Sequence, residues 1–176
     1  MHANPDIDIR SVMIRDDGNF PGNAELPLVL YTNVLARTGF DDFQALFIAN
    51  AWGGTWRNGL FPYHHYHSTA HEVIGIARGM LRVQFGGELG PEFVLNAGDA
   101  VVIPAGVAHR NLEHSDDYLV IGAYPGGEIW DLHTGIEGER PRSDDNISQV
   151  ELPTTDPVAG VEGPLIRLWH LAPTAK

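Results

Sequence analysis

The chain has no cysteine, few basic residues and no long apolar run. The absence of cysteine excludes disulfides, thiolate nucleophiles and every metal site that needs sulfur ligands. Lys and Arg number 11 against 23 Asp and Glu, for a net charge of −12 that would repel nucleic acid and anionic membranes. Without a basic leader or an apolar stretch of membrane-spanning length, we expect a soluble cytoplasmic protein with neither of those partners.

Glycine and proline, which favour turns, are frequent in the chain. The 20 glycines and 12 prolines separate short β-branched or aromatic runs, with no helical pattern between them. Such spacing favours an all-β sandwich or barrel, and 176 residues suit one domain spanning 1–176. The expected strands are 28–31, 73–77, 81–85, 93–95, 100–103 and 118–121.

Three segments depart from this pattern. In residues 41–52, apolar side chains recur at intervals of three and four and Gly53-Gly54 follows, which predicts one short N-terminal helix. Residues 125–163 are rich in Gly, Pro and acids and are expected to form a surface excursion. Residues 165–171 are apolar enough to return as a final, docked strand.

Although the chain has no cysteine, it has nine histidines, and four of them lie within residues 64–71. On a strand, side chains at i and i+2 share a face, so His65 and His67 can present two imidazoles to one ion. The best candidates for the remaining ligands are Glu72 and His109.

The position of Glu72 raises a question of parity. It lies five residues beyond His67, so on an unbroken strand it would face the opposite side. A bulge or tight turn between Ser68 and His71 would bring it back. If the strand is unbroken, His71 is the rival third ligand.

These residues belong to two spaced motifs that resemble the two motifs of the cupins. One departure is that Glu113 stands where cupins usually have Asn, the nearby Asn being Asn111. The residues around both motifs are similar to the YjlB-like group of uncharacterised bacterial cupins. The motifs, at 59–79 and 98–113, are Gly59-x5-His65-x-His67-x4-Glu72-x6-Gly79 and Gly98-x5-Pro104-x-Gly106-x2-His109.

The resemblance implies a double-stranded β-helix, a jelly-roll-type barrel. It also implies one divalent ion near the barrel axis, held by His65, His67, Glu72 and His109. Three imidazoles and a carboxylate suit Fe, Mn, Ni, Zn or Cu, and affinity order alone does not choose among them. Four protein ligands on an octahedral ion leave two positions for water, dioxygen or a substrate.

Other polar residues near the motifs are candidates for supporting roles. His64, His71 and Asn111 are expected beside the ligands or at the rim of the pocket. Tyr63, His71 and Glu113 are candidate general acids or bases, and Glu113 and Asn111 share the parity of His109, which predicts that both face inward.

The remaining histidines and the tryptophans have no motif context. We expect the histidines to be surface or packing residues and the tryptophans to be core residues, although tryptophans can also line a pocket. They are His2, His114, His133 and His170, and Trp52, Trp56, Trp130 and Trp169.

Three functions fit these expectations. The first is a metal-dependent oxidoreductase, dioxygenase-like, acting on a small organic molecule. The second is an isomerase that uses the ion as a Lewis acid, and oxygen consumption would separate the two. The third is a non-enzymatic small-ligand binding or sensing domain, which a plugged pocket would favour. The resemblance also implies a homodimer, for which residues 26–31 are the candidate pairing strand.

Overall fold

The computed structural model describes residues 7–36 and 41–170, where the chain forms two antiparallel sheets and three helices. The larger sheet has the order β1-β2-β7-β4-β9-β3 and the smaller one the order β6-β5-β8. The strands are β1 (Asp8–Val12), β2 (Leu28–Thr32), β3 (Trp52–Asn58), β4 (Glu72–Arg78), β5 (Met80–Phe85), β6 (Glu92–Asn96), β7 (Ala100–Ile103), β8 (His109–His114) and β9 (Leu119–Pro125). The helices are α1 (Asp42–Ala49), α2 (Arg142–Ile147) and α3 (Pro164–His170).

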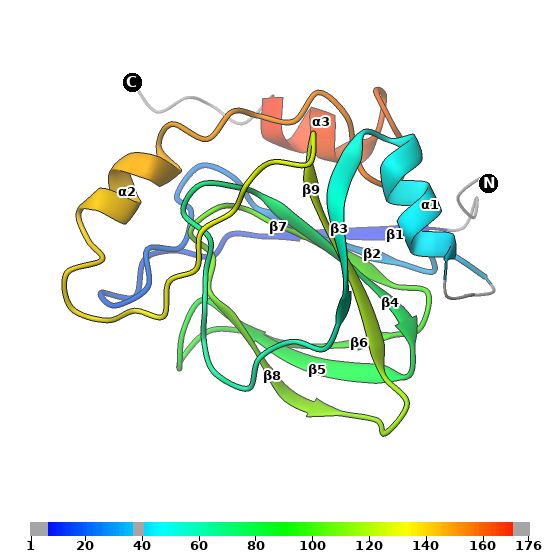
Figure 1. Cartoon of the computed structure of the whole chain (residues 1–176), viewed down its shortest axis with the longest axis horizontal. Coiled ribbons are helices and arrows are strands. Elements are labelled where there is room, and N and C mark those ends of the chain that lie inside the picture. Colours follow the sequence, from blue (N-terminus) through cyan, green and yellow to red (C-terminus); the bar gives the residue numbers. More distant parts are fainter. Residues whose placement is uncertain (1–6, 37–40, 171–176) are drawn as a thin grey trace.

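The two sheets face each other and enclose the barrel interior, with α1 and α3 on the outer side of the larger sheet (Figure 1). Alternate residues of β2 divide between the two sides. Leu28 and Leu30 belong to the interior cluster, whereas Val29 and Tyr31 pack in the cluster that includes α1 and α3. Because both faces are covered at the centre of the larger sheet, its inner strands β2, β7, β4 and β9 are almost continuously apolar, whereas the edge strands β1 and β3 are more polar and more exposed. The predicted all-β, jelly-roll-type fold is confirmed.

Residues 165–171 do not form the expected strand. They contribute to α3, whose Leu165 and Trp169 are buried four residues apart while Arg167 between them is exposed. That spacing places one apolar stripe against the sheet, and Pro164 suits the first turn of a helix. The strand prediction is therefore wrong, and Leu171 lies outside the described residues.

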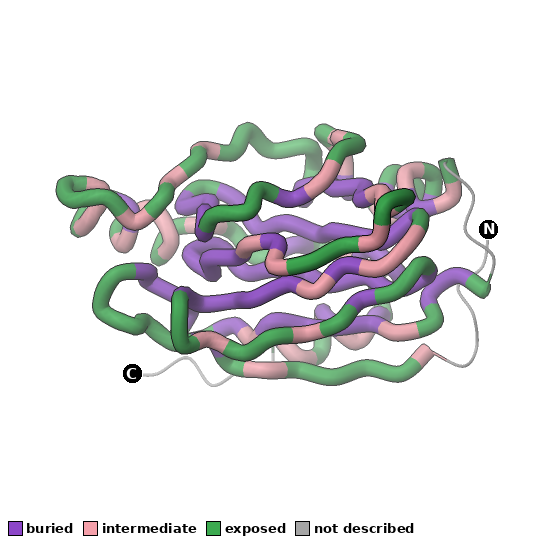
Figure 2. The backbone as a smooth tube through the Cα atoms, turned by 90° about the horizontal axis from the view of Figure 1, so that it is seen from below, coloured by how far each residue is buried: buried purple, intermediate pink, exposed green. Residues whose placement is uncertain are grey.

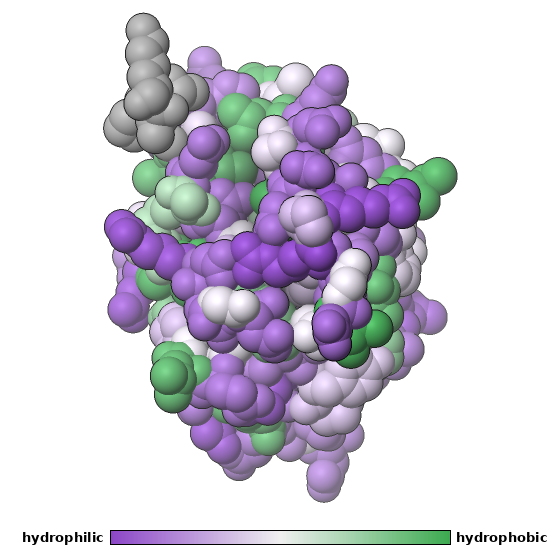
Figure 3. Space-filling view, turned by 90° about the vertical axis from the view of Figure 1, so that its left-hand side faces the viewer, coloured by the Kyte–Doolittle hydropathy of each residue, from purple (hydrophilic) through white to green (hydrophobic). Residues whose placement is uncertain are grey.

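The helix expected over 41–52 is confirmed as α1, although it ends at Ala49. The excursion after β9 contains α2 and runs along the outside of the barrel (Figure 1). Burial is concentrated in the central strands (Figure 2), and the face that carries α2 is mostly hydrophilic (Figure 3). Among the described helices, none combines the length and the apolar character needed to cross a membrane.

The candidate dimerisation strand lies inside the larger sheet. β2 is hydrogen bonded to β1 on one side and to β7 on the other. Its backbone groups are therefore already paired, and residues 26–31 cannot add a strand from a second copy. Strand addition at β2 is therefore excluded, while the homodimer and a contact through residues 26–31 stay predictions.

Candidate metal centre

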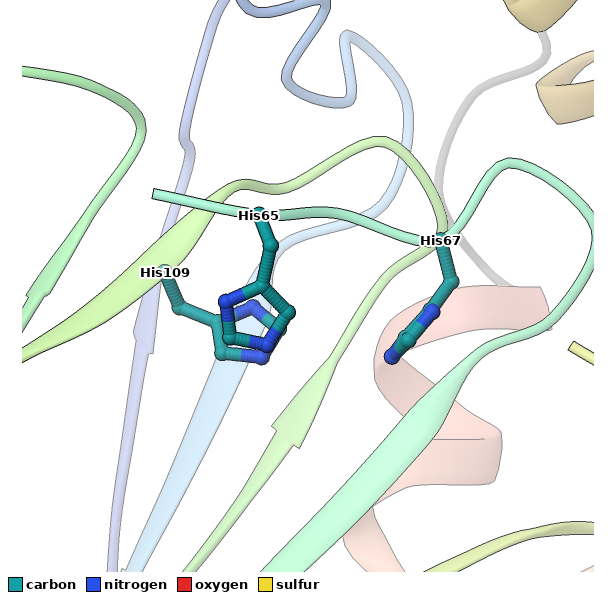
Figure 4. A group of neighbouring side chains, drawn as sticks. All are labelled: His65, His67 and His109. Carbon is teal, nitrogen blue, oxygen red and sulfur yellow. The ribbon is translucent and has the colours of Figure 1, made fainter. Parts of the chain in front are cut away.

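Three histidine rings converge at one end of the barrel (Figure 4). His65 and His67 come from the segment before β4, and His109 is the first residue of β8. The backbones of His65 and His109 exchange two hydrogen bonds, with N–O distances of 3.2 and 2.9 Å. One nitrogen of each ring lies within 4.8 Å of the others, and all three residues are buried.

The chain breaks between His67 and β4, as the parity of Glu72 requires. A bend at Ser68 and Thr69 separates them, and the Glu72 Oε2 atom then lies 3.4 Å from Nε2 of both His67 and His109. His71 points elsewhere, where its Nδ1 accepts a hydrogen bond from a backbone N–H at 2.9 Å. The alternative in which His71 joins His65 and His67 is therefore wrong.

Each of the three rings places Nδ1 against a backbone carbonyl. A carbonyl only accepts hydrogen bonds, so each Nδ1 carries the proton and each Nε2 exposes a lone pair. This arrangement fixes the tautomer that binds a metal through Nε2. The pairs are His65 with the Tyr63 carbonyl at 3.3 Å, His109 with the Val107 carbonyl at 3.2 Å, and His67 with the Asp131 carbonyl at short range.

Glu72 lies beside the three histidines and has hydrogen-bond donors on only one of its two carboxylate oxygens. Oε1 accepts hydrogen bonds from the Trp56 Nε1–H at 3.1 Å and the Tyr124 hydroxyl at 2.9 Å. Oε2 is buried and has no hydrogen-bond donor. Three imidazole lone pairs and a carboxylate oxygen thus face one another, an arrangement of acceptors that is unfavourable without a cation. The donor set therefore fits a divalent ion with nitrogen and oxygen ligands.

The electrostatics of the group follow from its burial. Burial, reinforced by His109, lowers the pKa of His65 to about 3, so that ring is neutral near pH 7. Burial raises the pKa of the Glu72 carboxyl, but His67 and His109 outweigh it and hold the value well below its usual range. For His67, burial lowers the pKa while Glu72 and Asp131 raise it, and the net change is upward. A proton on His67 is thus the substitute for a cation.

A cavity of about 240 Å³ opens onto this group. Trp56, Phe61, Trp130 and Leu132 supply much of its wall. The expectation that all four tryptophans are core residues is correct for Trp52 and Trp169, which are buried. It is wrong for Trp130, which is 45% exposed and lines the cavity, while Trp56 both packs against the interior cluster and lines the cavity.

Sequence reasoning missed Asp131, which connects the excursion to the metal group. Besides the contact of its carbonyl with His67, its carboxylate accepts hydrogen bonds from the Ser68 backbone at 2.6 Å and from the Ser68 hydroxyl. The same carboxylate lies 2.8 Å from Nε2 of His133, which is half-buried. His133 also exchanges two backbone hydrogen bonds of 2.9 Å with Tyr66. No sequence motif indicated this contact, because 64 residues separate His67 from Asp131.

Glu113 does not face inward with His109. The β5–β8 register pairs Val83 with Asn111 but Arg82 with Glu113, so Leu112 is an extra residue that bulges from β8. A bulge of one residue reverses the parity beyond it, which turns Glu113 outward to an ion pair with Arg82 at 3.1 Å. The expectation that Glu113 faces the site is wrong.

Asn111 is buried on the inner face of β8. Its Nδ2 lies 3.2 Å from the Tyr118 hydroxyl, whereas its Oδ1 has no hydrogen-bond partner. Like His71, it lies within a motif in sequence but does not line the cavity beside the three histidines.

Tyr63 and His64 flank the first ligand without touching the cavity. Tyr63 is exposed and stacks on Phe61, with ring centroids 4.9 Å apart. His64 is buried, with its ring 5.2 Å from that of Phe20. His64 therefore packs behind the first ligand and is not at the rim of the pocket. Of the residues without motif context, His2 lies outside the described residues.

A larger cavity, of about 410 Å³, lies between the N-terminal loop, α2 and α3. Its lining residue Arg140 is paired with Asp16 at 2.5 Å and with Asp144 at 2.9 Å, both of which also line the cavity. The metal group and its cavity are elsewhere.

Solved structures with a similar fold include three proteins with different activities. Acireductone dioxygenase from Bacillus anthracis, with a cadmium ion in its active centre, is 18% identical, with a TM-score of 0.36 over 48% of this chain and 57% of that one. The DMSP lyase DddQ from Ruegeria pomeroyi is 19% identical, with a TM-score of 0.35 over 76% and 54%. An oxalate decarboxylase variant from Bacillus subtilis is 18% identical, with a TM-score of 0.35 over 73% and 27%. Likenesses this weak say nothing of activity.

The sequence comparisons are stronger. Residues 57–121, which contain both motifs, match the family described as "Cupin domain". Over 154 residues, the chain is 44% identical to the uncharacterised protein YjlB of Bacillus subtilis, a match that covers 88% of this chain and 92% of that protein. The chain therefore belongs to the cupins, and within them to the YjlB-like group.

Proposed function

We propose that this cupin is a divalent-metal-dependent oxidoreductase of the dioxygenase type, acting on a small organic molecule. His65, His67, Glu72 and His109 hold the ion, which is Fe, Mn, Ni, Zn or Cu by ligand chemistry, with Fe and Mn best suited to redox work. The observation that carries the proposal is the convergence of three imidazoles beside an open cavity, with the donor-less Oε2 of Glu72 at 3.4 Å from the Nε2 atoms of His67 and His109.

When bound, the ion supplies a redox-active or Lewis-acidic centre with positions left for small ligands. The chain's own residues prepare that centre. Trp56 and Tyr124 hold Glu72 by its Oε1 atom, so that Oε2 is directed at the histidines. Carbonyls at the outer side of the rings keep each Nε2 free of a proton. The aromatic wall limits access of water to the bound molecule.

The alternatives receive less support from the geometry. An isomerase needs a general acid or base beside the bound molecule, and neither His71 nor Glu113 lines the cavity. Tyr63 is also outside the lining. A non-enzymatic sensing domain is favoured by a plugged pocket, whereas about 240 Å³ is open beside the ligand group.

The test is elemental analysis of protein purified without added metal. Wild-type protein should carry close to one transition-metal ion per chain, and His67→Ala and Glu72→Gln should lose it. His71→Ala is the matched control, since this buried neighbour should leave the metal in place. Metal that survives both ligand substitutions would overturn the assignment. Oxygen uptake with a turned-over substrate, lost on metal removal and regained on reloading, would then separate an oxidoreductase from an isomerase.

A further inference from the structure

The wall of the metal cavity is formed largely by apolar and aromatic side chains. Trp130, Leu132 and Phe61 line it and remain 45%, 43% and 45% exposed. Large side chains that stay partly exposed around one opening indicate a surface that binds something apolar. Leu60 and Trp56 continue the same wall.

Aromatic rings stand beside two of the imidazoles. The ring of Trp130 lies 5.1 Å from that of His67 and stacks against Tyr124 at 5.8 Å. The ring of Phe61 lies 5.0 Å from that of His65, edge to face. A molecule that reaches the metal group must therefore pass between aromatic surfaces, which favour a flat or apolar body.

The deep polar groups of the wall are already engaged. The Trp56 Nε1–H and the Tyr124 hydroxyl both donate to Glu72 Oε1. The other polar side chains of the lining outside the metal group, Arg57 and Asn58, are at exposed positions. In the deep part of the cavity, a polyhydroxylated molecule would lose its hydration without regaining hydrogen bonds from the wall, which is costly.

The charge of the metal site determines which head group of a bound molecule would be favourable next to the ion. Glu72 is the only carboxylate among the four residues proposed to hold the ion. A divalent ion held by one carboxylate and neutral imidazoles retains about one unit of positive charge in a buried site. An anionic oxygen head group would neutralise that charge.

From these four observations we infer the substrate class: a small monoanion with two adjacent oxygen donors and an apolar, preferably aromatic, body. The head lies at His65, His67, Glu72 and His109, and the body lies against Trp130, Leu132 and Phe61. The cavity volume of about 240 Å³ is below the range of about 300–1,000 Å³ typical of drug-sized ligands, which suits a body no larger than a single ring. The inference rests on the proposed metal centre.

The experiment compares three hydroxamates that share one chelating head. Benzohydroxamate has an aromatic body, acetohydroxamate a methyl group and gluconohydroxamate a hydroxylated chain. Metal content is first measured by elemental analysis, and binding to loaded and metal-free protein is then measured by calorimetry and by tryptophan fluorescence. We expect benzohydroxamate to bind about tenfold more tightly than acetohydroxamate, and gluconohydroxamate to bind most weakly.

Variants of the wall locate the effect. Trp130→Ala and Leu132→Ala should each reduce the preference for benzohydroxamate about threefold or more, with unchanged metal content and unchanged acetohydroxamate affinity. Ile129→Ala is the control, because Ile129 adjoins this segment but is 91% exposed and does not line the cavity.

Two results would overturn the inference, and they are distinguishable. Wild-type protein that binds no metal removes the proposed function and this inference with it, before any hydroxamate is added. Loaded protein that binds the three hydroxamates equally, prefers gluconohydroxamate, or keeps its full preference in both wall variants leaves the metal centre standing and overturns the substrate class.

Discussion

Glu72 and Asp156 are the most deeply buried carboxylates among the described residues, 2% and 0% exposed. Asp156 is fully paired. Its Oδ1 accepts from the backbone N–H groups of Val158 and Ala159 at 2.7 and 2.9 Å, and its Oδ2 from the Tyr31 hydroxyl at 2.8 Å and the Leu165 N–H at 2.9 Å. It thereby fastens the start of α3 to β2.

Glu72 differs in having donors on one oxygen only. Trp56 and Tyr124 satisfy Oε1, while Oε2 faces imidazole lone pairs. Burial without full pairing is unfavourable, so it persists in a protein where something else completes it. The contrast separates a carboxylate that stabilises the fold from one that is reserved for a ligand.

The most disruptive change should be Asp156→Asn. The amide replaces one acceptor oxygen with a donor that faces backbone N–H groups or the Tyr31 hydroxyl. We expect the free energy of unfolding to fall by about 2 to 4 kcal/mol, measured by urea denaturation. Metal affinity per folded molecule should be unchanged, and a loss of metal from the folded variant would contradict the separation of the two sites.

The same acid-to-amide change at Glu72 should have the opposite profile. In metal-free protein, a glutamine keeps one oxygen for Trp56 and Tyr124 and turns its amide donor toward the histidine lone pairs. We expect Glu72→Gln to alter the metal-free unfolding free energy by about 1 kcal/mol or less. Saturating metal should raise the Tm of wild-type protein but not of the variant. A loss as large as that of Asp156→Asn would show that Glu72 is structural.

The two tyrosines that donate to these carboxylates provide a finer test. Tyr124→Phe removes one donor to Glu72 and should weaken metal binding about tenfold, with little effect on stability. Tyr31→Phe removes one donor to Asp156 and should lower the unfolding free energy by about 1 to 2 kcal/mol, with metal binding unchanged. Metal titration and urea denaturation of both variants check that Tyr124→Phe affects mainly metal affinity and Tyr31→Phe mainly stability. Equal effects of the two substitutions in either assay would contradict it.

The smallest expected effect is a pH trend of opposite sign in the two forms of the protein. The pKa of His67 is raised above 6.5, since Glu72 and Asp131 outweigh burial. In metal-free protein, the stability from this proton is fully present below the unfolded pKa and is lost as pH rises through the folded pKa. Between about pH 6.5 and 8.5, the metal-free Tm should fall by roughly 2 °C or less, while metal affinity rises as His67 deprotonates. Glu72→Gln should flatten the metal-free trend, and a rising Tm in wild type would contradict the assignment.

Short-range patterns in the sequence predicted much of the fold. Short β-branched or aromatic runs indicated six of the nine described strands but not β1, β3 or β8, and the apolar spacing of Phe43 and Phe47 indicated α1. The same local reasoning failed for α3, because Leu165 and Trp169 suit a strand as well as a helix. In the folded chain, the buried Asp156 accepts a hydrogen bond from the Leu165 N–H at the start of α3. This contact favours the helix and is not visible in the local sequence pattern.

The site shows the same limit. Motif spacing brought His65, His67, Glu72 and His109 together in the prediction, and parity correctly required a break before Glu72. The prediction that Glu113 faces inward was wrong, because no sequence pattern indicated the bulge at Leu112. Asp131, Trp130 and Leu132 come from a loop whose path no periodic pattern predicts.

In the short segment from Trp130 to Leu132, alternate residues have different roles. Asp131 is tied to the histidine segment through its carbonyl and carboxylate, whereas its two neighbours line the cavity. Such a division lets side chains at 130 and 132 vary while the backbone between them stays fixed. In directed evolution, libraries at these two positions should therefore yield new ligand preferences with the metal retained, whereas insertions or deletions beside Asp131 should cost metal and ligand binding together.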